Sequence, residues 1–374
     1  MDFPISLSPR FSGVEKVAEA PVTALARIFH TPHETKSHYR RRREESFRTN
    51  TSGRRTPHVV SYSPCEISGL AVLFTSMFLI CGMLTGCAKS KIEVIAYCAQ
   101  DQAYAEPIFQ DFQKQTGIRV QAVYDNEAVK TVALANRLLA ERNHPQCDVF
   151  WGNEEMRTRQ LAAQEIFRAT NGWAAFGFRS RRIVINTNRV SLASAPRSLT
   201  DLTNEFWRGK VALAYPQFGT TATHFHALRQ FWGEASWQTW CRALAANKPF
   251  LLDGNSTVVK MVGRGDAWVG LTDSDDIADG QREGLPIQAL PMTPDTLLLP
   301  NTVAIVRDSP HPEAAERLFA FLQRPEVVQR LVTAKALEGI STAEVSGTTL
   351  KVSWETLLRD LEPATSILNQ VFLR

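Results

Sequence analysis

The fold is decided by KIEVIAY at residues 91–97, a predicted strand, and AYAEPIFQDFQKQ at 103–115, an amphipathic helix that Gly117 ends. A second strand at 118–123, a helix at 130–141 and a third strand at 147–151 follow. Such alternation of strands and helices is typical of a parallel sheet covered by helices. The sequence therefore predicts an α/β protein.

The same alternation continues to the C-terminal part of the chain. Strands are predicted at 182–186, 210–215, 267–271 and 302–306, and helices at 155–165, 222–231, 236–246, 256–264, 313–322 and 325–335. No linker rich in Pro or Gly separates the two α/β units, so we predict two lobes joined by crossing strands. We assign residues 88–185 and 292–340 to the first lobe. The second lobe and the C-terminal helices take residues 186–291 and 341–374.

An apolar run, ISGLAVLFTSMFLICGML, occupies residues 67–84, and its last residue begins the tetrapeptide Leu84-Thr85-Gly86-Cys87. A basic flank upstream, an apolar core and small residues before a cleavage point predict a secretory signal. The tetrapeptide resembles the bacterial lipobox, in which the cysteine is acylated. We therefore predict a lipoprotein signal at 67–87 with Cys87 lipidated, and a transmembrane anchor as the alternative, because roughly 18 apolar residues can span a bilayer. Both place the rest of the chain outside the cytoplasm, in the periplasm or on the outer face of a bacterial membrane.

The segment 1–66 precedes this run and is polar, with four arginines at 40–43. It is interpreted as a disordered leader or as a misassigned start. The arginines are interpreted as the cytoplasmic flank of the signal, with no nucleic-acid partner. They contribute to the net charge of +4, which therefore says little about the ligand.

The composition of 44% hydrophobic and 21% charged residues is that of a globular protein. Three cysteines follow Cys87, namely Cys98, Cys147 and Cys241. Cys98 follows one predicted strand and Cys147 precedes another, which places them at opposite ends of a parallel sheet, so we expect no disulfide. No spacing typical of a zinc site is present.

Seven short motifs in the mature region identify a family resemblance. They are YCAQD at 97–101, TGIRV at 116–120, DVFW at 148–151, RSRRIVI at 179–185, WRGKV at 207–211, GNS at 254–256 and HPEAA at 311–315. In this order they resemble the ferric-ion-binding family of ABC-transporter solute-binding proteins, over roughly residues 91–330. The resemblance implies a two-lobed, periplasmic-binding-protein-like fold of type II, each lobe a parallel-rich sheet flanked by helices. It also implies a monomer that closes on its ligand and delivers it to the permease and ATPase subunits of an importer.

Ligands of open parallel sheets bind beyond the carboxyl ends of the strands. Gln100, Asp101, Asn153 and Glu154 follow strands of the first lobe. In the second lobe the Gly219-Thr220-Thr221 turn enters a helix, where free N–H groups form an anion site. Ordinary capping by threonine is the alternative. Asn255 is either a cap or an anion donor, and the resemblance favours the donor.

The metal site departs from the family pattern. Family members that hold ferric iron use adjacent tyrosines where this chain has Thr-Asp-Ser-Asp-Asp at 272–276. The family histidine aligns with Asp101, and the family glutamate aligns with Asn153, next to Glu154. Asp101, Glu154, Asp273 and Asp275 are therefore the predicted ligands of a metal ion or an ammonium group. The alternative for the acidic segment is a solvated turn.

Trp151 and Phe218 lie beside predicted strand ends and either stack on an organic ligand or belong to the core. No catalytic motif appears, so no enzyme is predicted. The first prediction is a lipid-anchored binding protein for ferric iron, held with a synergistic anion such as phosphate or carbonate. The alternative is the same scaffold with a cationic or phosphorylated organic solute, such as an amine or a phosphonate.

Overall fold

The computed structural model describes residues 92–124, 130–345 and 349–373. The predicted leader, the signal segment and Cys87 lie outside the described residues. The strands are β1 (Glu93–Cys98), β2 (Arg119–Val123), β3 (Val149–Gly152), β4 (Trp173–Asn186), β5 (Val211–Ala214), β6 (Phe250–Leu252), β7 (Val269–Asp273), β8 (Ile287–Ala289) and β9 (Leu298–Ile305). The α-helices are α2 (Gln102–Thr116), α3 (Lys130–Ala140), α4 (Glu155–Ala163), α5 (Gly219–Trp232), α6 (Glu234–Ala246), α7 (Asn255–Arg264), α8 (Ser274–Arg282), α9 (Pro312–Leu322), α10 (Pro325–Thr333), α11 (Trp354–Arg359) and α12 (Leu361–Phe372).

The described strands form one mixed sheet in the order β2-β1-β3-β9-β4-β7-β5-β6, with β8 paired to β4. Its two ends are parallel, β2-β1-β3 on one side and β7-β5-β6 on the other. The predicted α/β class is confirmed. We call the part built on β1, β2 and β3 lobe 1, and the part built on β5, β6 and β7 lobe 2. The exact lobe boundaries given above stay predictions.

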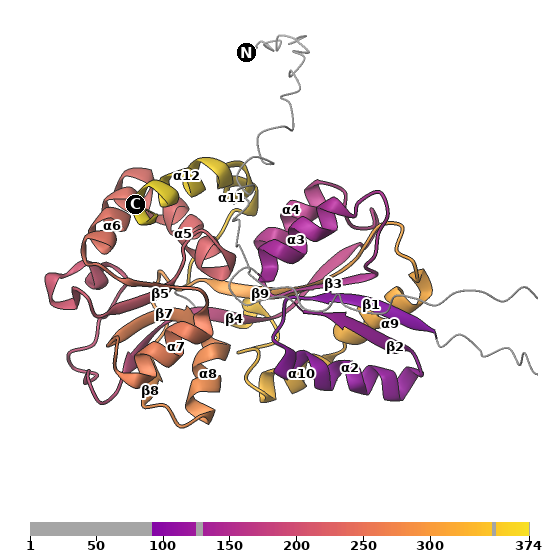
Figure 1. Ribbon diagram of the computed structural model, residues 1–374, viewed down its shortest axis with the longest axis horizontal. Helices are drawn as coiled ribbons and strands as arrows, with labels where there is room; N and C mark the ends of the chain where they lie inside the picture. Colours follow the sequence, from indigo (N-terminus) through magenta and orange to yellow (C-terminus); the bar gives the residue numbers. More distant parts are fainter. Residues whose placement is uncertain (1–91, 125–129, 346–348, 374) are drawn as a thin grey trace, which may run out of the picture. The chain divides into compact units, whose positions relative to one another are not determined.

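Two long antiparallel strands, β4 and β9, run from one lobe to the other (Figure 1). The first half of β4 pairs with β9, and the second half, from Arg181 to Ile185, pairs with β7. The sequence predicted only the last part of each strand, at 182–186 and 302–306. Gly177 interrupts β4 at a register shift, with φ of 57°. A Cβ there would lie 2.4 Å from a methyl carbon of Leu337, so a side chain would clash.

Helices cover both faces of each parallel block. In Figure 1, α3 and α4 lie on one face of lobe 1, and α2, α9 and α10 on the other. In lobe 2, α5, α6 and α12 lie on one face, and α7 and α8 on the other. Apolar clusters fill all four interfaces, as expected for parallel strands buried on both faces.

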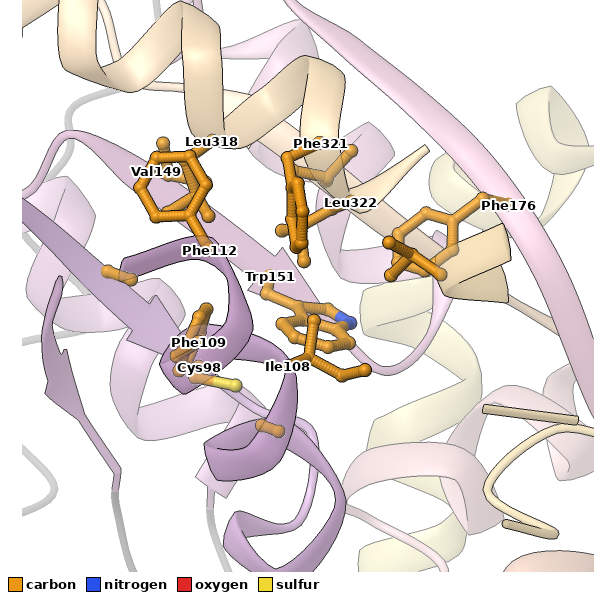
Figure 2. Packing of buried hydrophobic residues seen from close by; sticks show 14 of the residues in the cluster. Cys98, Ile108, Phe109, Phe112, Val149, Trp151, Phe176, Leu318, Phe321 and Leu322 are labelled. Carbon is orange, nitrogen blue, oxygen red and sulfur yellow. The ribbon is translucent and has the colours of Figure 1, made fainter. Parts of the chain in front are cut away.

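The largest of these clusters in lobe 1 contains Trp151, whose side chain is fully buried. Figure 2 shows its indole among Phe109, Ile108 and the aromatic rings of α9 and β4. The ring of Phe109 meets it edge to face at 5.5 Å between centroids, and the ring of Phe176 lies 5.9 Å away. Trp151 is therefore a core residue of lobe 1.

The C-terminal helices return to the junction of the lobes. α12 packs against α5 and α6, whereas α11 contacts both α4 and α5. The guanidinium of Arg159 on α4 lies 5.6 Å from the ring centroid of Trp354 on α11. Across the described ranges, every helix falls short of the length and apolarity needed to cross a membrane.

Candidate functional site

Arg181, on β4, is the centre of a buried polar network in lobe 2. Its Nη1 lies 2.6 Å from Oδ1 of Asp273 at the end of β7 and 2.9 Å from Oδ1 of Asn255 at the start of α7. Thr220, in the first turn of α5, donates its hydroxyl to Oδ2 of Asp273 at 2.8 Å. The amide of Asn255 donates to the same carboxylate oxygen at 3.1 Å. The structure thus brings three predicted site residues together around an arginine.

Arg179, two residues earlier on the same strand, links this network to lobe 1. Its Nη1 donates to Oδ2 of Asp275 at 2.5 Å, and its Nη2 lies 3.4 Å from Oδ2 of Asp273. The same Nη2 donates to the backbone carbonyl of Asn153, which follows β3, at 3.1 Å. One guanidinium therefore contacts both lobes where the crossing strand passes between them.

The charges in this group shift one another. Burial raises the pKa of Asp275 to about 6, although Arg179 opposes the shift. Burial would also raise the pKa of Asp273, but Arg181 and Arg179 hold it below its ordinary value. Burial lowers the pKa of Arg179, but Asp275, Asp273 and Asp101 more than offset this and leave it raised. Asp273 and Arg179 are therefore ionised at neutral pH, and Asp275 changes its charge most readily.

The acidic segment at 272–276 is not a solvated turn, so this alternative interpretation is wrong. Asp273 ends β7, and Ser274 begins α8, so Asp275 lies in the first turn of a helix. Both carboxylates are buried. Oxygens of Asp273, Asp275 and Asp276 all lie within 4.8 Å of one another, which is close enough for a shared cation.

The turn at 219–221 enters a helix, as predicted, because Gly219, with φ of 54°, begins α5. Its threonines do not cap that helix, since Phe218 is at the N-cap and no side-chain cap bond forms. Asn255 is not a cap either, because Gly254 takes that position on α7. The capping alternative is therefore wrong for these residues. The side chains of Thr220 and Asn255 join the network instead, and the hydroxyl of Thr221 has no partner among the described residues.

Glu154 caps α4 and joins the two lobes. Its carboxylate accepts from the backbone N–H of Met156 at 2.7 Å and of Arg157 at 3.0 Å. The hydroxyl of Thr223, on α5 of lobe 2, donates to it at 3.2 Å. Burial raises the pKa of Glu154 above its ordinary value. Capping explains its position, and its remaining contact is with the other lobe.

Gln100 follows β1 and is fully buried, and its Oε1 accepts from the amide of Asn301 on β9 at 2.7 Å. Asp101, the N-cap residue of α2, is partly buried, and its charge acts on Arg179 and Asp275. The structure therefore places Gln100 beside the crossing strand β9 and Asp101 near Arg179, which contacts both lobes.

The two aromatic candidates differ. Trp151 is in the core of lobe 1, which favours the packing role over stacking on a ligand. Phe218 is 37% exposed, directly before α5.

Several buried polar atoms at this junction have no hydrogen-bond partner among the described residues. They are Nε2 of Gln100, Nε of Arg179, Oγ of Ser180, Oγ1 of Thr221, Oδ1 of Asp275 and Oδ1 of Asn301. Buried polar atoms in folded proteins are nearly always satisfied, by protein groups or by ordered water, so these atoms are open to bonds with a water, an ion or a solute. These atoms include donors and acceptors from both lobes.

Sequence reasoning missed the two arginines, although the motif at 179–185 was noted. Arg179 and Arg181 are two positions apart on one strand, so both point to the same face of the sheet. Two charged residues at this spacing before an apolar strand were the available signal. Their partners Asp273 and Asp275 are more than 90 positions away in the chain, which no local pattern reveals.

A further contact between the lobes joins α2 to α8. The hydroxyl of Tyr104 on α2 donates to a carboxylate oxygen of Asp279 on α8 and accepts from Nη2 of Arg282 at 2.7 Å. Arg282 also donates to the backbone carbonyl of Ala334, beyond α10, at 2.8 Å. These bonds hold α8 of lobe 2 against lobe 1.

Comparison with known proteins places this geometry in context. The family described as bacterial extracellular solute-binding protein matches residues 93–334. The Fe(3+)-binding periplasmic protein of Serratia marcescens is 28% identical over 216 residues, which cover 54% of this chain and 62% of that relative. The chain therefore spans less than two thirds of that relative's length.

Solved structures resemble the fold more completely. Iron-bound HitA from Pseudomonas aeruginosa has a TM-score of 0.66 at 20% identity, covering 75% of this chain and 99% of that one. AfuA from Actinobacillus pleuropneumoniae, with fructose-6-phosphate bound, has a TM-score of 0.64 at 18% identity, covering 76% and 99%. Both are periplasmic binding proteins of the two-lobed kind, so the predicted two-lobed fold is confirmed.

Proposed function

Because the chain belongs to the bacterial extracellular solute-binding protein family, we propose that it captures a small polar solute between its lobes for an ABC importer. The observation that carries this proposal is the group of buried, unpartnered polar atoms on both sides of the lobe junction. On the side of lobe 1 these atoms belong to Gln100 and Asn301. On the side of lobe 2 they belong to Arg179, Thr221 and Asp275. A solute that bonds to both sets holds the lobes together, which is how two-lobed proteins close.

We propose ferric iron as the first solute, accompanied by an anion such as phosphate or carbonate. The Serratia relative and HitA bind iron according to their names, and Asp273, Asp275 and Asp276 offer three clustered carboxylates. Asp101 adds a fourth negative charge that acts on the group. The first turn of α5, at Thr220 and Thr221, would hold the anion by its free N–H groups.

A phosphorylated organic solute is the second candidate, and the neutralised state of the carboxylates favours it. Arg179 and Arg181 already neutralise Asp275 and Asp273, and the segment 272–276 contains no tyrosine to give ferric iron a phenolate ligand. The Nε–H of Arg179 and the free N–H groups in the first turn of α5 remain as donors for a phosphate. AfuA, which has the same fold, holds a sugar phosphate.

We also propose that the mature protein begins at Cys87 and is held by lipid on the outer face of a bacterial membrane. The support is the tetrapeptide at residues 84–87 after the apolar run. In this position a monomer passes its solute to the permease of the importer, with the ATPase subunits on the inner side.

Analysis of the solute that co-purifies with the native protein tests the proposal directly. Elemental analysis detects iron, and mass spectrometry of the denatured extract detects an organic phosphate. Calorimetric titration with ferric citrate and with fructose-6-phosphate then measures each affinity. The proposal is contradicted if the purified protein carries neither iron nor an organic phosphate and binds neither ferric citrate nor fructose-6-phosphate. Its small-angle scattering profile would then also stay the same when either solute is added.

Two variants separate the candidates. If iron is the solute, Asp275→Asn weakens ferric binding at least tenfold, whereas Asp266→Asn, at an exposed carboxylate beyond α7, leaves it unchanged. Iron affinity also falls when the anion is dialysed away, because the two ligands are coupled reciprocally. If a phosphorylated solute is bound, Thr221→Val removes an unpartnered hydroxyl of the anion site and lowers the affinity for that solute, whereas Asp275→Asn does not.

A further inference from the structure

Lobe 2 contains a cavity of about 360 Å³, lined by residues of α5, β4, β7 and the loops at 192–199 and 290–296. Its walls are largely apolar and include the buried side chains of Leu199, Leu271 and Leu290. The exposed side chains of Leu192 and Arg197 also line it, so it reaches the surface. Its volume and lining are those of a small-molecule pocket.

His224, on α5, is a buried polar residue of this cavity, with 1% of its surface exposed. Its Nε2 lies 2.7 Å from the backbone carbonyl of Asp295, and a carbonyl only accepts, so Nε2 carries the proton. Burial, together with the charge of Arg181, lowers the pKa of His224 to about 3, so the ring is neutral. Nδ1 is therefore an acceptor, and it has no partner among the described residues.

Arg181 lines the same cavity and supplies the complementary donor. Its Nη groups are used by Asp273, Asn255 and the carbonyl of Leu271. Its Nε–H has no partner within the described part of the chain. The positive charge is already balanced by Asp273 at 2.6 Å. The cavity thus combines one unpaired donor and one unpaired acceptor with apolar walls.

We propose that this cavity is a second ligand site, which takes a small, uncharged and largely apolar molecule carrying one hydroxyl group. A hydroxyl donates to Nδ1 of His224 and accepts from Nε–H of Arg181, and the apolar body fills the space between Leu199, Leu271 and Leu290. A carboxylate fits worse, because it cannot donate to Nδ1 and because Asp273 has already neutralised Arg181. The Asp295 carboxylate does not compete, since it accepts from the N–H of Leu199 at 3.1 Å and from the hydroxyl of Thr293.

Apart from Arg181, the lining of this cavity shares no residue with the solute site at the lobe junction. All its lining residues come from 181–199, 224, 271 and 290–296, and none is an acidic residue of the junction. The inference therefore stands without the proposed cargo. Arg181 belongs to both places, so a ligand in the cavity contacts the arginine that holds Asp273.

Three matched probes test the proposal by calorimetry on the whole mature chain: thymol, p-cymene, which lacks only the hydroxyl, and the anion cuminate. We expect one thymol to bind per chain, with p-cymene about tenfold weaker because it leaves the buried donor and acceptor unpaired. Cuminate should bind no better than p-cymene. Equal affinity for thymol and p-cymene, or tighter binding of cuminate, overturns the proposal.

Variants locate the site. His224→Phe removes the acceptor and should abolish the preference for thymol, whereas His226→Phe, on the same helix but outside the cavity, should behave as wild type. Leu290→Trp fills the cavity and should abolish binding of both probes. Thymol binding that persists in Leu290→Trp overturns the proposal.

A measurement on the wild-type protein covers the case in which a variant does not fold. In nitrogen NMR of labelled histidine, saturating thymol should shift the Nδ1 signal of His224 and leave that of His226 unchanged. Bound thymol without a shift at His224 contradicts the assignment of the site.

Discussion

The buried pair of Arg181 and Asp273 provides the sharpest test of how lobe 2 is held together. Arg181→Met keeps the length of the side chain and removes its charge, leaving Asp273 buried with the hydroxyl of Thr220 at 2.8 Å and Arg179 at 3.4 Å. Removing one partner of a buried ion pair costs about 3 kcal/mol or more, and we expect the lower end here because Arg179 still faces the carboxylate. For a protein of this size that loss corresponds to a decrease in Tm of roughly 6–12 °C.

Calorimetry or circular dichroism of thermal unfolding at pH 7 measures this decrease. Arg182→Met is the matched control, because Arg182 is the next residue on β4 and its ion pair with Glu338, at 3.1 Å, is partly exposed. Such a pair contributes about 1 kcal/mol or less. Arg181→Met should therefore lower Tm by several degrees more than Arg182→Met.

A double variant separates charge loss from packing loss. Asp273→Asn added to Arg181→Met removes the uncompensated charge and keeps the bonds to Thr220 and Asn255, so it should restore about 2 kcal/mol. The reasoning is refuted if Arg181→Met unfolds within 1 °C of Arg182→Met, a difference well below the roughly 2 °C expected for each kcal/mol. Strict additivity of the two single changes would refute it as well.

Four further outcomes are expected. Trp151→Ala should lower the free energy of unfolding by about 3–5 kcal/mol in urea, since the indole is fully buried, and a loss below about 1 kcal/mol would contradict its core position. Burial raises the pKa of Asp275 from 3.8 to about 6, so ionisation opposes folding: stability should fall as the pH rises from about 4 to 6, and Asp275→Asn should lack this fall. Tyr104→Phe removes the hydroxyl bonded to Asp279 and should increase the radius of gyration measured by small-angle scattering, whereas an unchanged profile would show that this contact does not hold the lobes. Cys87→Ser should release the protein from the membrane fraction while its Tm stays the same, and intact mass of the wild type should show an acylated cysteine.

The local elements could be predicted from the sequence because their signal is local. The helix predicted at 103–115 is α2, Gln102–Thr116, and the helix predicted at 256–264 is α7, Asn255–Arg264. A period of 3.6 residues with a glycine at the end needs no knowledge of the rest of the chain. The alternation of these elements was sufficient for the α/β class.

The crossing strands were predicted only in part. Gly177 interrupts β4, and the charged Arg179 and Arg181 are buried in its middle, so hydrophobic periodicity gives no continuous strand signal across residues 177–181. The strand forms because β9 pairs with its backbone from a position far along the chain. Whether such a strand forms, and where it begins, therefore depends on the tertiary structure.

The candidate site shows the same division. The sequence alone indicated which segments follow the strands, and from them the positions of Asp101, Thr220, Asn255 and Asp273. Only the tertiary structure decided their chemistry, because Arg181 contacts Asp273 from 92 residues away and turns an acidic segment into a neutralised network. Local pattern determines where a chain turns and which face is apolar, whereas the charge of a buried site depends on which distant side chains burial forces together.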